Sequence, residues 1–410
     1  MDHMTKNNLY SKHQHGFRRH RCCVTQLLQV MEDLTEMIDE GSTFDIIYLD
    51  FKKAFDQVPH FRLLRKLKAY GITGRVHKWV SNFLCNRKQW VRVGSACSSQ
   101  ANVSSGIPQG SILGPVLFTV FINDLPECVQ SYCRVFADDT KIYNKTSDSK
   151  VLQHDVDMLQ EWSQKWCLFF NSLKCKVLYG GRNNTENVYF MDQDSNKVNV
   201  QKCETEKDLG VIFDGKLEFN AHIESVINKS NKIVGILRRT FSYLNKDTFL
   251  KLYKALVRPH LEYANVIWYP KYKYQSVSIE RVQRRATKLL PETQGMTYEQ
   301  RLRYLQLPSL KYRRLRGDMI QMFKIMNGID DLDKQHFFES SKYDRTRNSG
   351  DKIFIQHSKT NTRKFSFSRR VAPLWNTKLT PKTKLSTNLN TFKTLLDREP
   401  FFFQNKYLFD

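Results

Sequence analysis

Residues 133–143 have the sequence CRVFADDTKIY, and this stretch decides the fold. Two short runs, 133–136 and 140–143, are rich in the β-branched and aromatic residues that favour strands. Between them lie Ala137, Asp138 and Asp139, which are typical of a hairpin turn. The stretch therefore predicts an antiparallel hairpin with two carboxylates at its tip.

A second predicted strand also ends in an acidic residue. Residues 44–49 (FDIIYL) form an apolar run, and Asp50 follows it. If this strand lies beside the hairpin, Asp50 comes close to Asp138 and Asp139. Such a cluster of carboxylates is unfavourable unless divalent cations neutralise it, and hard oxygen ligands suit Mg²⁺. Taken singly, the acids have ordinary alternatives, since Asp138 and Asp139 suit any turn and Asp50 could cap a helix.

Periodicity predicts a mixture of strands and helices in the first 219 residues and helices beyond them. Further strands are predicted at 89–93, 98–103, 176–179, 188–191 and 209–213, and helices at 24–38, 61–70, 75–84, 112–125 and 152–169. Because no regular βαβ rhythm is present, the pattern favours an α+β fold with an antiparallel sheet. From residue 222 onward helices are predicted near 223–237, 247–259 and 279–290, with β-like runs at 352–356 and 365–367.

The net charge of +24 is concentrated in the second part of the chain. Residues 231–410 contain 36 basic and 15 acidic residues, whereas residues 1–230 contain 29 and 26. In the helix near 279–290, four basic residues share one face at i, i+3, i+4 and i+7, namely Arg281, Arg284, Arg285 and Lys288. Neighbouring like charges repel each other, and a phosphate backbone reverses that sign. A solvated surface is the alternative.

Composition argues against several other classes of protein. The nine cysteines are irregularly spaced without a CxxC motif, so we expect reduced thiols, an intracellular protein and no structural zinc. The longest apolar run, residues 112–122, is too short to span a membrane, which needs about 20 residues. No apolar stretch follows the basic N-terminus as in a secretory signal. We therefore expect a nuclear or cytoplasmic location and no membrane partner.

Three motifs in order carry a specific resemblance. They are LDFKKAFD (49–56), GIPQGS (106–111) and FADD (136–139), and they resemble motifs A, B and C of reverse transcriptases, most closely those of Jockey-type non-LTR retrotransposons. QHGFR (14–18), NSLKC (171–175) and DLGV (208–211) resemble the block before motif A, motif D and the primer grip, motif E. Residues 252–268 and 282–286 resemble the downstream region of the same elements.

The resemblance implies a role for each matching residue. Asp50, Asp138 and Asp139, with the backbone carbonyl of Phe51, would hold two Mg²⁺ ions for in-line nucleotidyl transfer. Phe55 matches the aromatic residue that excludes a ribose 2′-hydroxyl, and Gln109 and Gly110 match residues that pack against the incoming nucleotide and template. Lys174 matches a proposed general acid, with an ordinary surface lysine as the alternative. Leu209 and Gly210 lie in the primer-grip block.

The resemblance also implies a domain organisation and a set of substrates. We expect partial fingers and a palm over 1–219, a helical thumb over 220–295 and a basic nucleic-acid-binding region over 296–410, as in a right-hand polymerase. The block matching residues 14–18 lies close to the start, so we expect an N-terminally truncated copy or a fragment. The implied partners are an RNA template, a DNA primer and deoxynucleoside triphosphates.

The sequence leaves three other functions open. The first is a decayed, non-catalytic nucleic-acid-binding remnant of such an element. The second is an RNA-dependent RNA polymerase, against which Phe55 and the FADD motif argue. The third and weakest is a membrane-surface protein, because no long amphipathic segment with a lipid-like face is present.

Overall fold

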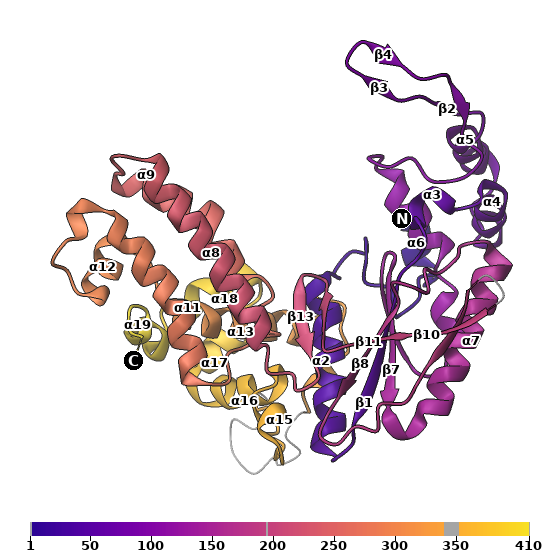
Figure 1. The fold of residues 1–410 in the computed structure, drawn as a ribbon. Helices are drawn as coiled ribbons and strands as arrows, with labels where there is room; N and C mark the ends of the chain where they lie inside the picture. The colour runs from indigo at the N-terminus through magenta and orange to yellow at the C-terminus, as the bar shows by residue number, and fades with distance from the viewer. Residues whose placement is uncertain (1, 194–195, 340–351, 410) are drawn as a thin grey trace. The chain divides into compact units, whose positions relative to one another are not determined.

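The computed structural model describes residues 2–193, 196–339 and 352–409, and the chain forms two compact units (Figure 1). Unit 1 comprises residues 1–26 and 42–204, and unit 2 comprises residues 27–41 and 205–410. The predicted three-part division into residues 1–219, 220–295 and 296–410 stays a prediction, and residues 340–351 of its last part lie outside the described residues.

A five-stranded sheet forms the centre of unit 1. Its strand order is β11 (Gln201–Cys203), β8 (Lys176–Gly180), β1 (Phe44–Leu49), β7 (Asp139–Lys145) and β6 (Tyr132–Phe136). All neighbouring pairs are antiparallel except β11 and β8, which are parallel. The expectation of an antiparallel sheet was therefore wrong at this edge, and the sheet is mixed. The expected α+β class is confirmed.

Helices complete unit 1 and close its core. They are α1 (Asp2–Lys6), α3 (Ala54–Gln57), α4 (His60–Ala69), α5 (Gly74–Leu84), α6 (Leu113–Phe121), α7 (Ser149–Trp166), and the short 3₁₀ segments η1 (Leu125–Cys128) and η2 (Thr146–Asp148). Apolar side chains of α4, α6 and α7 share one buried cluster with Ile47 and Leu49 of β1 and Ile142 of β7. The alternation of Ile47 and Leu49 places them on one face of the sheet, as a half-buried strand requires.

Two smaller pairings complete the strands of unit 1. Residues 88–102 form a two-stranded ribbon, in which β2 (Lys88–Gln89) pairs with β5 (Ala101–Asn102) and β3 (Arg92–Val93) pairs with β4 (Ala96–Cys97). The ribbon projects beyond α5 (Figure 1). Strands β9 (Phe190–Gln193) and β10 (Asn196–Asn199) form the other antiparallel pair.

Unit 2 is mainly helical. It begins with most of α2 (Cys23–Asp39), and later contains the hairpin of β12 (Thr205–Asp208) and β13 (Val211–Asp214). The helices that follow are α8 (Asn220–Thr240), α9 (Lys246–Leu252), the π-helical turn η3 (Tyr253–Val257), α10 (Arg258–Glu262), α11 (Lys273–Ala286), η4 (Thr287–Leu289), η5 (Pro291–Thr293), α12 (Tyr298–Leu305), α13 (Leu310–Met326), α14 (Lys334–Phe337), α15 (Asn361–Lys364), α16 (Phe367–Lys378), α17 (Pro381–Lys384), α18 (Leu389–Leu396) and α19 (Pro400–Asn405).

Three predicted elements of unit 2 need correction. Pro259 does not end a helix but lies in the first turn of α10, where its missing N–H is not needed. Residues 209–210 form a turn, and the strand predicted at 209–213 starts at Val211. The β-like runs near the C-terminus are wrong, because residues 365–367 join α15 to α16 and the described residues 352–356 form no strand.

The α2 helix is tied to the C-terminal helices by buried charges. The Glu32 carboxylate accepts from the Arg363 guanidinium at 2.9 Å and from the Ser368 hydroxyl at 2.7 Å. Two turns later, Asp39 accepts from the backbone N–H of Thr360 at 2.7 Å. Breaking one partner of such a buried pair leaves an uncompensated charge, so these contacts hold residues 360–368 onto a helix more than 300 positions earlier.

Two expectations from composition can be compared with the structure. All nine cysteines are free thiols. In the part of the chain that the structure describes, no helix is long and apolar enough to cross a membrane.

Candidate active site

Asp50 and Asp138 lie at the same end of the central sheet of unit 1. Asp50 directly follows β1, whose last residue Leu49 pairs with Thr140 of β7. Asp138 lies in the two-residue turn between β6 and β7, which the Phe136–Asp139 pair closes. The turn requires a positive φ of 53° at Ala137, an uncommon backbone conformation for a residue with a side chain. Tight pairing of β1 with the hairpin thus brings the first two predicted carboxylates together.

The two carboxylates repel each other. Burial raises the pKa of Asp138 above its ordinary value, and the negative charge of Asp50 raises this pKa further. Asp139, the third predicted acid, is the first residue of β7 and is exposed to solvent. A cation placed near Asp50 and Asp138 would relieve their repulsion.

Lys174 supplies one positive charge at this point. Its Nζ lies 3.5 Å from Oδ2 of Asp50, and its side chain is 69% exposed. The loop that carries it is docked onto the end of β1, because the backbone N–H of Asn171 donates to the Asp50 carbonyl at 2.7 Å. The Asp50 N–H in turn points to Sγ of Cys175 at 3.5 Å. Backbone contacts therefore fix the position of Lys174 beside Asp50, while most of its side chain is exposed to solvent.

Cys175 is a structural neighbour of this site and not a nucleophile. The residue is fully buried, and burial raises the pKa of its thiol to about 12. A thiol with such a pKa remains protonated at neutral pH, so it cannot act as a thiolate ligand or nucleophile.

Phe51 and Phe55 follow Asp50 and have different surroundings. The Phe51 ring is buried and stacks on Phe170 with 4.4 Å between ring centroids, so only its backbone could serve as a ligand. Phe55 stacks on Phe118, also at 4.4 Å. It lines a cavity of about 420 Å³ together with Gln109 and Gly110. The structure thus gathers three of the four predicted nucleotide-binding residues around one cavity.

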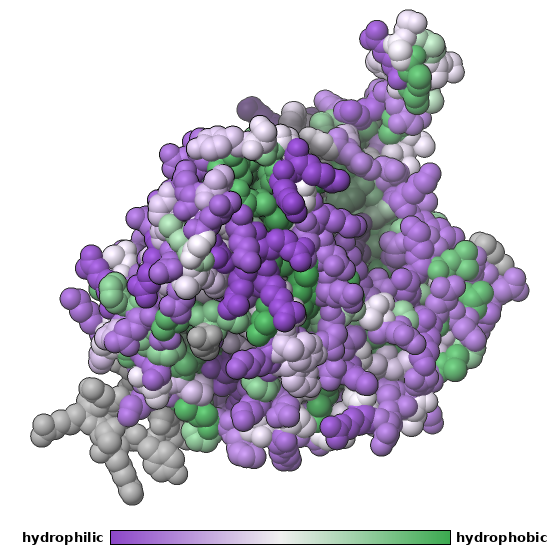
Figure 2. Space-filling view, turned by 60° about the vertical axis from the view of Figure 1, so that its left-hand side comes forward, coloured by the Kyte–Doolittle hydropathy of each residue, from purple (hydrophilic) through white to green (hydrophobic). Residues whose placement is uncertain are grey.

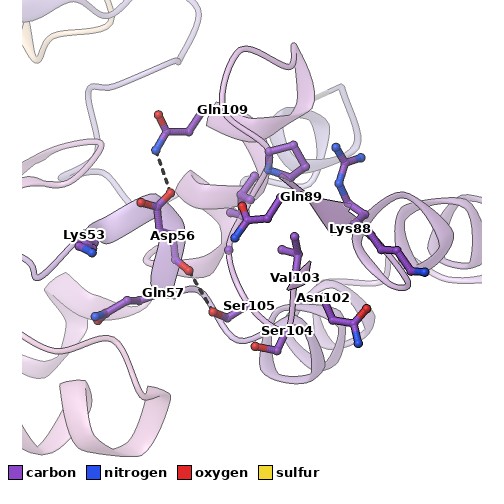
Figure 3. Close-up of a pocket in the computed structure, with 14 residues that line it drawn as sticks. Lys53, Asp56, Gln57, Lys88, Gln89, Asn102, Val103, Ser104, Ser105 and Gln109 are labelled. Carbon is purple, nitrogen blue, oxygen red and sulfur yellow. Dashed lines mark hydrogen bonds between the residues drawn. The ribbon is translucent and has the colours of Figure 1, made fainter. Parts of the chain in front are cut away.

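The loop that carries Gln109 is held by Asp56. The Gln109 side-chain amide donates to Oδ1 of Asp56 at 2.9 Å, and the Ser105 hydroxyl donates to the Asp56 carbonyl at 3.0 Å (Figure 3). Gly106 has a φ of +95°, and a Cβ there would lie 2.7 Å from that carbonyl oxygen. Only glycine fits this position, because both the conformation and the space exclude a side chain.

The carboxylate oxygens of Asp50 and Asp138 partly fit the needs of a divalent metal ion. Within the described residues, no group of three or more His, Cys, Asp or Glu side chains is arranged to hold a metal ion. Asp50 and Asp138 nevertheless offer hard oxygen donors whose mutual repulsion a cation would relieve. Mg²⁺ commonly takes one or two carboxylates and completes its shell with water and substrate phosphates. The pair therefore suits Mg²⁺, and the metal-binding roles of Asp139 and of the Phe51 carbonyl stay predictions.

The predicted primer-grip residues form a tight hairpin turn in unit 2. Leu209 and Gly210 both have positive φ values, 44° and 87°, as a two-residue turn between β12 and β13 requires. The Tyr263 hydroxyl donates to the Leu209 carbonyl at 2.8 Å, and a Cβ on Gly210 would lie 3.1 Å from the Tyr263 ring. Tyr263 therefore packs against this turn, and the contact of the turn with a primer stays a prediction.

The four basic residues predicted to share a face of α11 and η4 do not have one environment. Arg281, Arg285 and Lys288 are exposed. The Arg284 guanidinium instead lies over the rings of Tyr298 and Phe409, at 4.8 and 5.1 Å from their centroids. Cation–π contacts of this kind stabilise packing, so Arg284 has a structural environment that the others lack.

In unit 1, sequence reasoning missed one buried charged residue. Lys66 of α4 is 4% exposed, contacts Asp124 at 2.5 Å, and has its Nζ 3.7 Å from the centroid of the Trp166 ring. Burial lowers its pKa to about 8. A signal was present, because Lys66 falls between Leu63 and Leu67 on the apolar stripe of the helix.

Comparison with known protein families shows to which family the chain belongs. The model of the family described as reverse transcriptase (RNA-dependent DNA polymerase) matches residues 1–213. The chain belongs to the reverse transcriptase family. The match includes Asp50, Asp138 and Lys174, together with the loop around Gln109.

The chain is similar to curated RNA-directed DNA polymerases of non-LTR retrotransposons from Drosophila. The chain is 29% identical over 282 residues to a probable RNA-directed DNA polymerase from transposon X-element of Drosophila melanogaster, a match that covers 65% of this chain and 30% of that protein. It is 30% identical over 275 residues to the RNA-directed DNA polymerase from mobile element jockey of Drosophila funebris, covering 62% and 29%. The predicted Jockey-like resemblance is confirmed, and the chain spans about a third of the length of these reverse transcriptases.

Two solved structures of telomerase share less with the chain. Telomerases of Candida tropicalis and Candida albicans, both solved in complex with a fragment of telomeric RNA, are each 11% identical. Their TM-scores are 0.34 and 0.36, and the alignments cover 69% and 82% of this chain and 56% and 57% of theirs.

Proposed function

We propose that the chain is the RNA-directed DNA polymerase part of a non-LTR retrotransposon, acting in the nucleus or cytoplasm on a DNA primer annealed to an RNA template. The observation that carries the proposal is the end of the central sheet, where Asp50 and Asp138 lie together beside Lys174. The cavity lined by Phe55, Gln109 and Gly110 supplies a place for a deoxynucleoside triphosphate.

Each residue has a distinct part in this proposal. Asp50 and Asp138, with Asp139, would hold two Mg²⁺ ions, which stabilise the attacking and leaving oxygens of an in-line displacement. Lys174, beside Asp50, would donate a proton to the departing pyrophosphate. The Phe55 ring, fixed by its stack on Phe118, would meet a ribose 2′-hydroxyl and so favour deoxynucleotides.

Primer extension tests the proposal on the full chain. We expect Mg²⁺-dependent incorporation of deoxynucleotides into a DNA primer on an RNA template. Asp138→Asn keeps the size of the side chain but removes the charge, and we expect it to abolish extension. Asp157→Asn, at an exposed aspartate of α7, is the matched control and should extend at the wild-type rate. Extension by Asp138→Asn at the wild-type rate would show that the carboxylate assignment is wrong.

The alternative is a nucleic-acid-binding protein that no longer polymerises. The observation that favours it is that the described residues contain no preformed cluster of three metal-ligating side chains. RNA binding without incorporation, at any Mg²⁺ or Mn²⁺ concentration and with several primer–templates, would support this alternative against the polymerase.

A further inference from the structure

The positive charge of unit 1 is gathered in one continuous segment. Between Asp56 and Asp124 the chain has no acidic residue and contains nine lysines and arginines. This segment includes α4, α5, the ribbon and α6. Lys66 is buried and the other eight basic residues are exposed or partly exposed, so this segment of the near-neutral first half has a local basic surface, which attracts a polyanion.

The ribbon is the most exposed part of this segment. In Figure 2 it stands out at the top right as an arm that carries hydrophilic and hydrophobic side chains side by side. Trp90 is 55% exposed, and Val91 and Val93 are also exposed. A tryptophan this accessible on a projecting two-stranded ribbon contributes nothing to a core, so packing within unit 1 does not explain it.

A tryptophan lies between two basic residues along the ribbon. Lys88 belongs to β2 and Arg92 to β3, and Trp90 lies in the two-residue link between these strands; all three residues are exposed. The ribbon therefore carries an accessible aromatic ring between two positive charges. Proteins that hold single-stranded nucleic acid without sequence preference use this combination, in which bases stack on the ring and phosphates contact the cations.

A basic cavity lies at the base of the ribbon. The cavity has a volume of about 610 Å³, and its lining includes the charged residues Lys53, Arg87 and Lys88. Asp56 is the one carboxylate in its lining, and its Oδ1 already accepts from Gln109. Figure 3 shows this Asp56–Gln109 pair on one side of the cavity and Lys88 with Asn102 on the other. Positive charge therefore extends from Lys88, at the base of the ribbon, to the loop that carries Gln109.

We propose that the exposed residues Lys88, Trp90 and Arg92 bind a single-stranded nucleic acid, which then enters the basic cavity beside Gln109. Resting on the proposed function, we identify this strand as the unpaired part of the RNA template. Charge complementarity selects this occupant over a protein, since the segment has eight solvent-accessible basic residues and no acidic residue. The contact is to backbone and base faces, so it is independent of sequence.

Binding of a short RNA to the full chain tests the ribbon without any polymerisation. A labelled single strand of about 12 nucleotides, close to the site size of a single binding fold, is titrated without Mg²⁺ or nucleotides, and fluorescence anisotropy is recorded. We expect Trp90→Ala to weaken binding by about tenfold and Trp90→Phe to restore most of it. Trp79→Ala, at an exposed tryptophan of α5, is the control and should bind as the wild type. Equal affinity of Trp90→Ala and wild type overturns the proposal.

Photocrosslinking separates the ribbon from the basic helices of unit 2. RNA that contains 4-thiouridine should crosslink to the tryptic peptide of residues 89–92, which contains Trp90. Crosslinks that map only to unit 2, or a peptide of residues 89–92 that remains unmodified, overturn the proposal.

RNA binding and crosslinking are also measured in Asp138→Asn, the variant expected not to extend primers. These measurements separate the RNA-binding inference from the polymerase function. If the chain extends primers and Trp90→Ala binds RNA like the wild type, the ribbon assignment alone fails. If RNA crosslinks to the ribbon but the wild type never extends a primer, the proposed polymerase fails and the ribbon remains a nucleic-acid site. If an unlabelled duplex competes as well as a single strand does, the single-strand assignment is wrong.

Discussion

The side-chain Oε1 of Gln14 accepts a hydrogen bond from the backbone N–H of Ala137, 123 residues later, at 3.1 Å. The same oxygen accepts from the N–H of Gly16 at 2.6 Å. Gln14 is 1% exposed, and a Cβ on Gly16 would lie 2.5 Å from the Ala137 nitrogen. Residues 14–16 therefore hold the turn that presents Asp138, although they lie far from it in sequence.

This contact predicts that Gln14 is a positioning residue. Gln14→Met keeps the length of the side chain but removes the acceptor of two buried N–H groups, those of Gly16 and Ala137, and each buried N–H left unpaired costs about 1–3 kcal/mol. We expect the kcat for primer extension to fall about tenfold or more, with the KM for deoxynucleotides nearly unchanged, because the turn at Asp138 loosens while the cavity at Phe55 stays intact.

Gln26 provides a matched control for this prediction. It is a buried glutamine whose side-chain amide has no hydrogen-bond partner within the described structure. Gln26→Met should leave kcat unchanged, whereas Gly16→Ala should act like Gln14→Met. A uniform loss of activity in all three variants would indicate general destabilisation instead of positioning.

How far the sequence predicts this site depends on how local each contact is. The β1 strand and the hairpin around Asp138 were predictable, because alternation and turn chemistry act within a few residues. The docking of the Asn171–Cys175 loop onto Asp50 was not, since it uses backbone groups that no side-chain pattern reveals. The parallel addition of β11 to the sheet likewise follows from tertiary packing.

Local patterns also misled in the C-terminal region. The alternation at 365–367 is typical of a strand, yet Ser366 precedes the first residue of α16 and Phe367 is buried against other helices. Arg284 matched a basic face, but its aromatic partners Tyr298 and Phe409 come from later segments that periodicity cannot place.

Phe55 should decide which sugar the chain accepts. Phe55→Val removes the ring from the cavity while leaving Gln109 and Gly110 in place. We expect the ratio of kcat/KM for a ribonucleotide to that for the matching deoxynucleotide to rise about tenfold or more, because the clash with the 2′-hydroxyl is lost. Competition between dGTP and GTP on one RNA template measures the ratio. An unchanged ratio of kcat/KM values would show that Phe55 does not select the sugar of the incoming nucleotide.

Lys66 should make the stability of unit 1 depend on pH. Burial lowers its folded-state pKa from 10.5 to about 8, so between these values the unfolded chain binds more protons and the free energy of unfolding rises with pH. Below about pH 8 the ammonium group is charged in both states and the cost of burying it applies in full. Lys66→Met should remove this rise, which is at most about 1.4 kcal/mol per pH unit.

Urea unfolding at a series of pH values measures the effect. Lys68 lies on the exposed side of the same helix, and Lys68→Met should keep the pH dependence of the wild type. If wild type and Lys66→Met have parallel pH profiles, Lys66 is not the titrating group.

The basic face of α11 and η4 should bind nucleic acid through three residues and not through the fourth. Arg281, Arg285 and Lys288 are exposed, and replacing all three with glutamine should flatten the salt dependence of primer–template binding by about three units of slope. Arg284→Gln should instead lower the unfolding temperature with little change in that slope, because its guanidinium packs between Tyr298 and Phe409. Filter binding at several salt concentrations and thermal unfolding of both variants give the two readouts. If Arg284→Gln reduces the salt slope as much as each exposed residue does, Arg284 reaches the phosphates, and the distinction drawn from its aromatic neighbours is wrong.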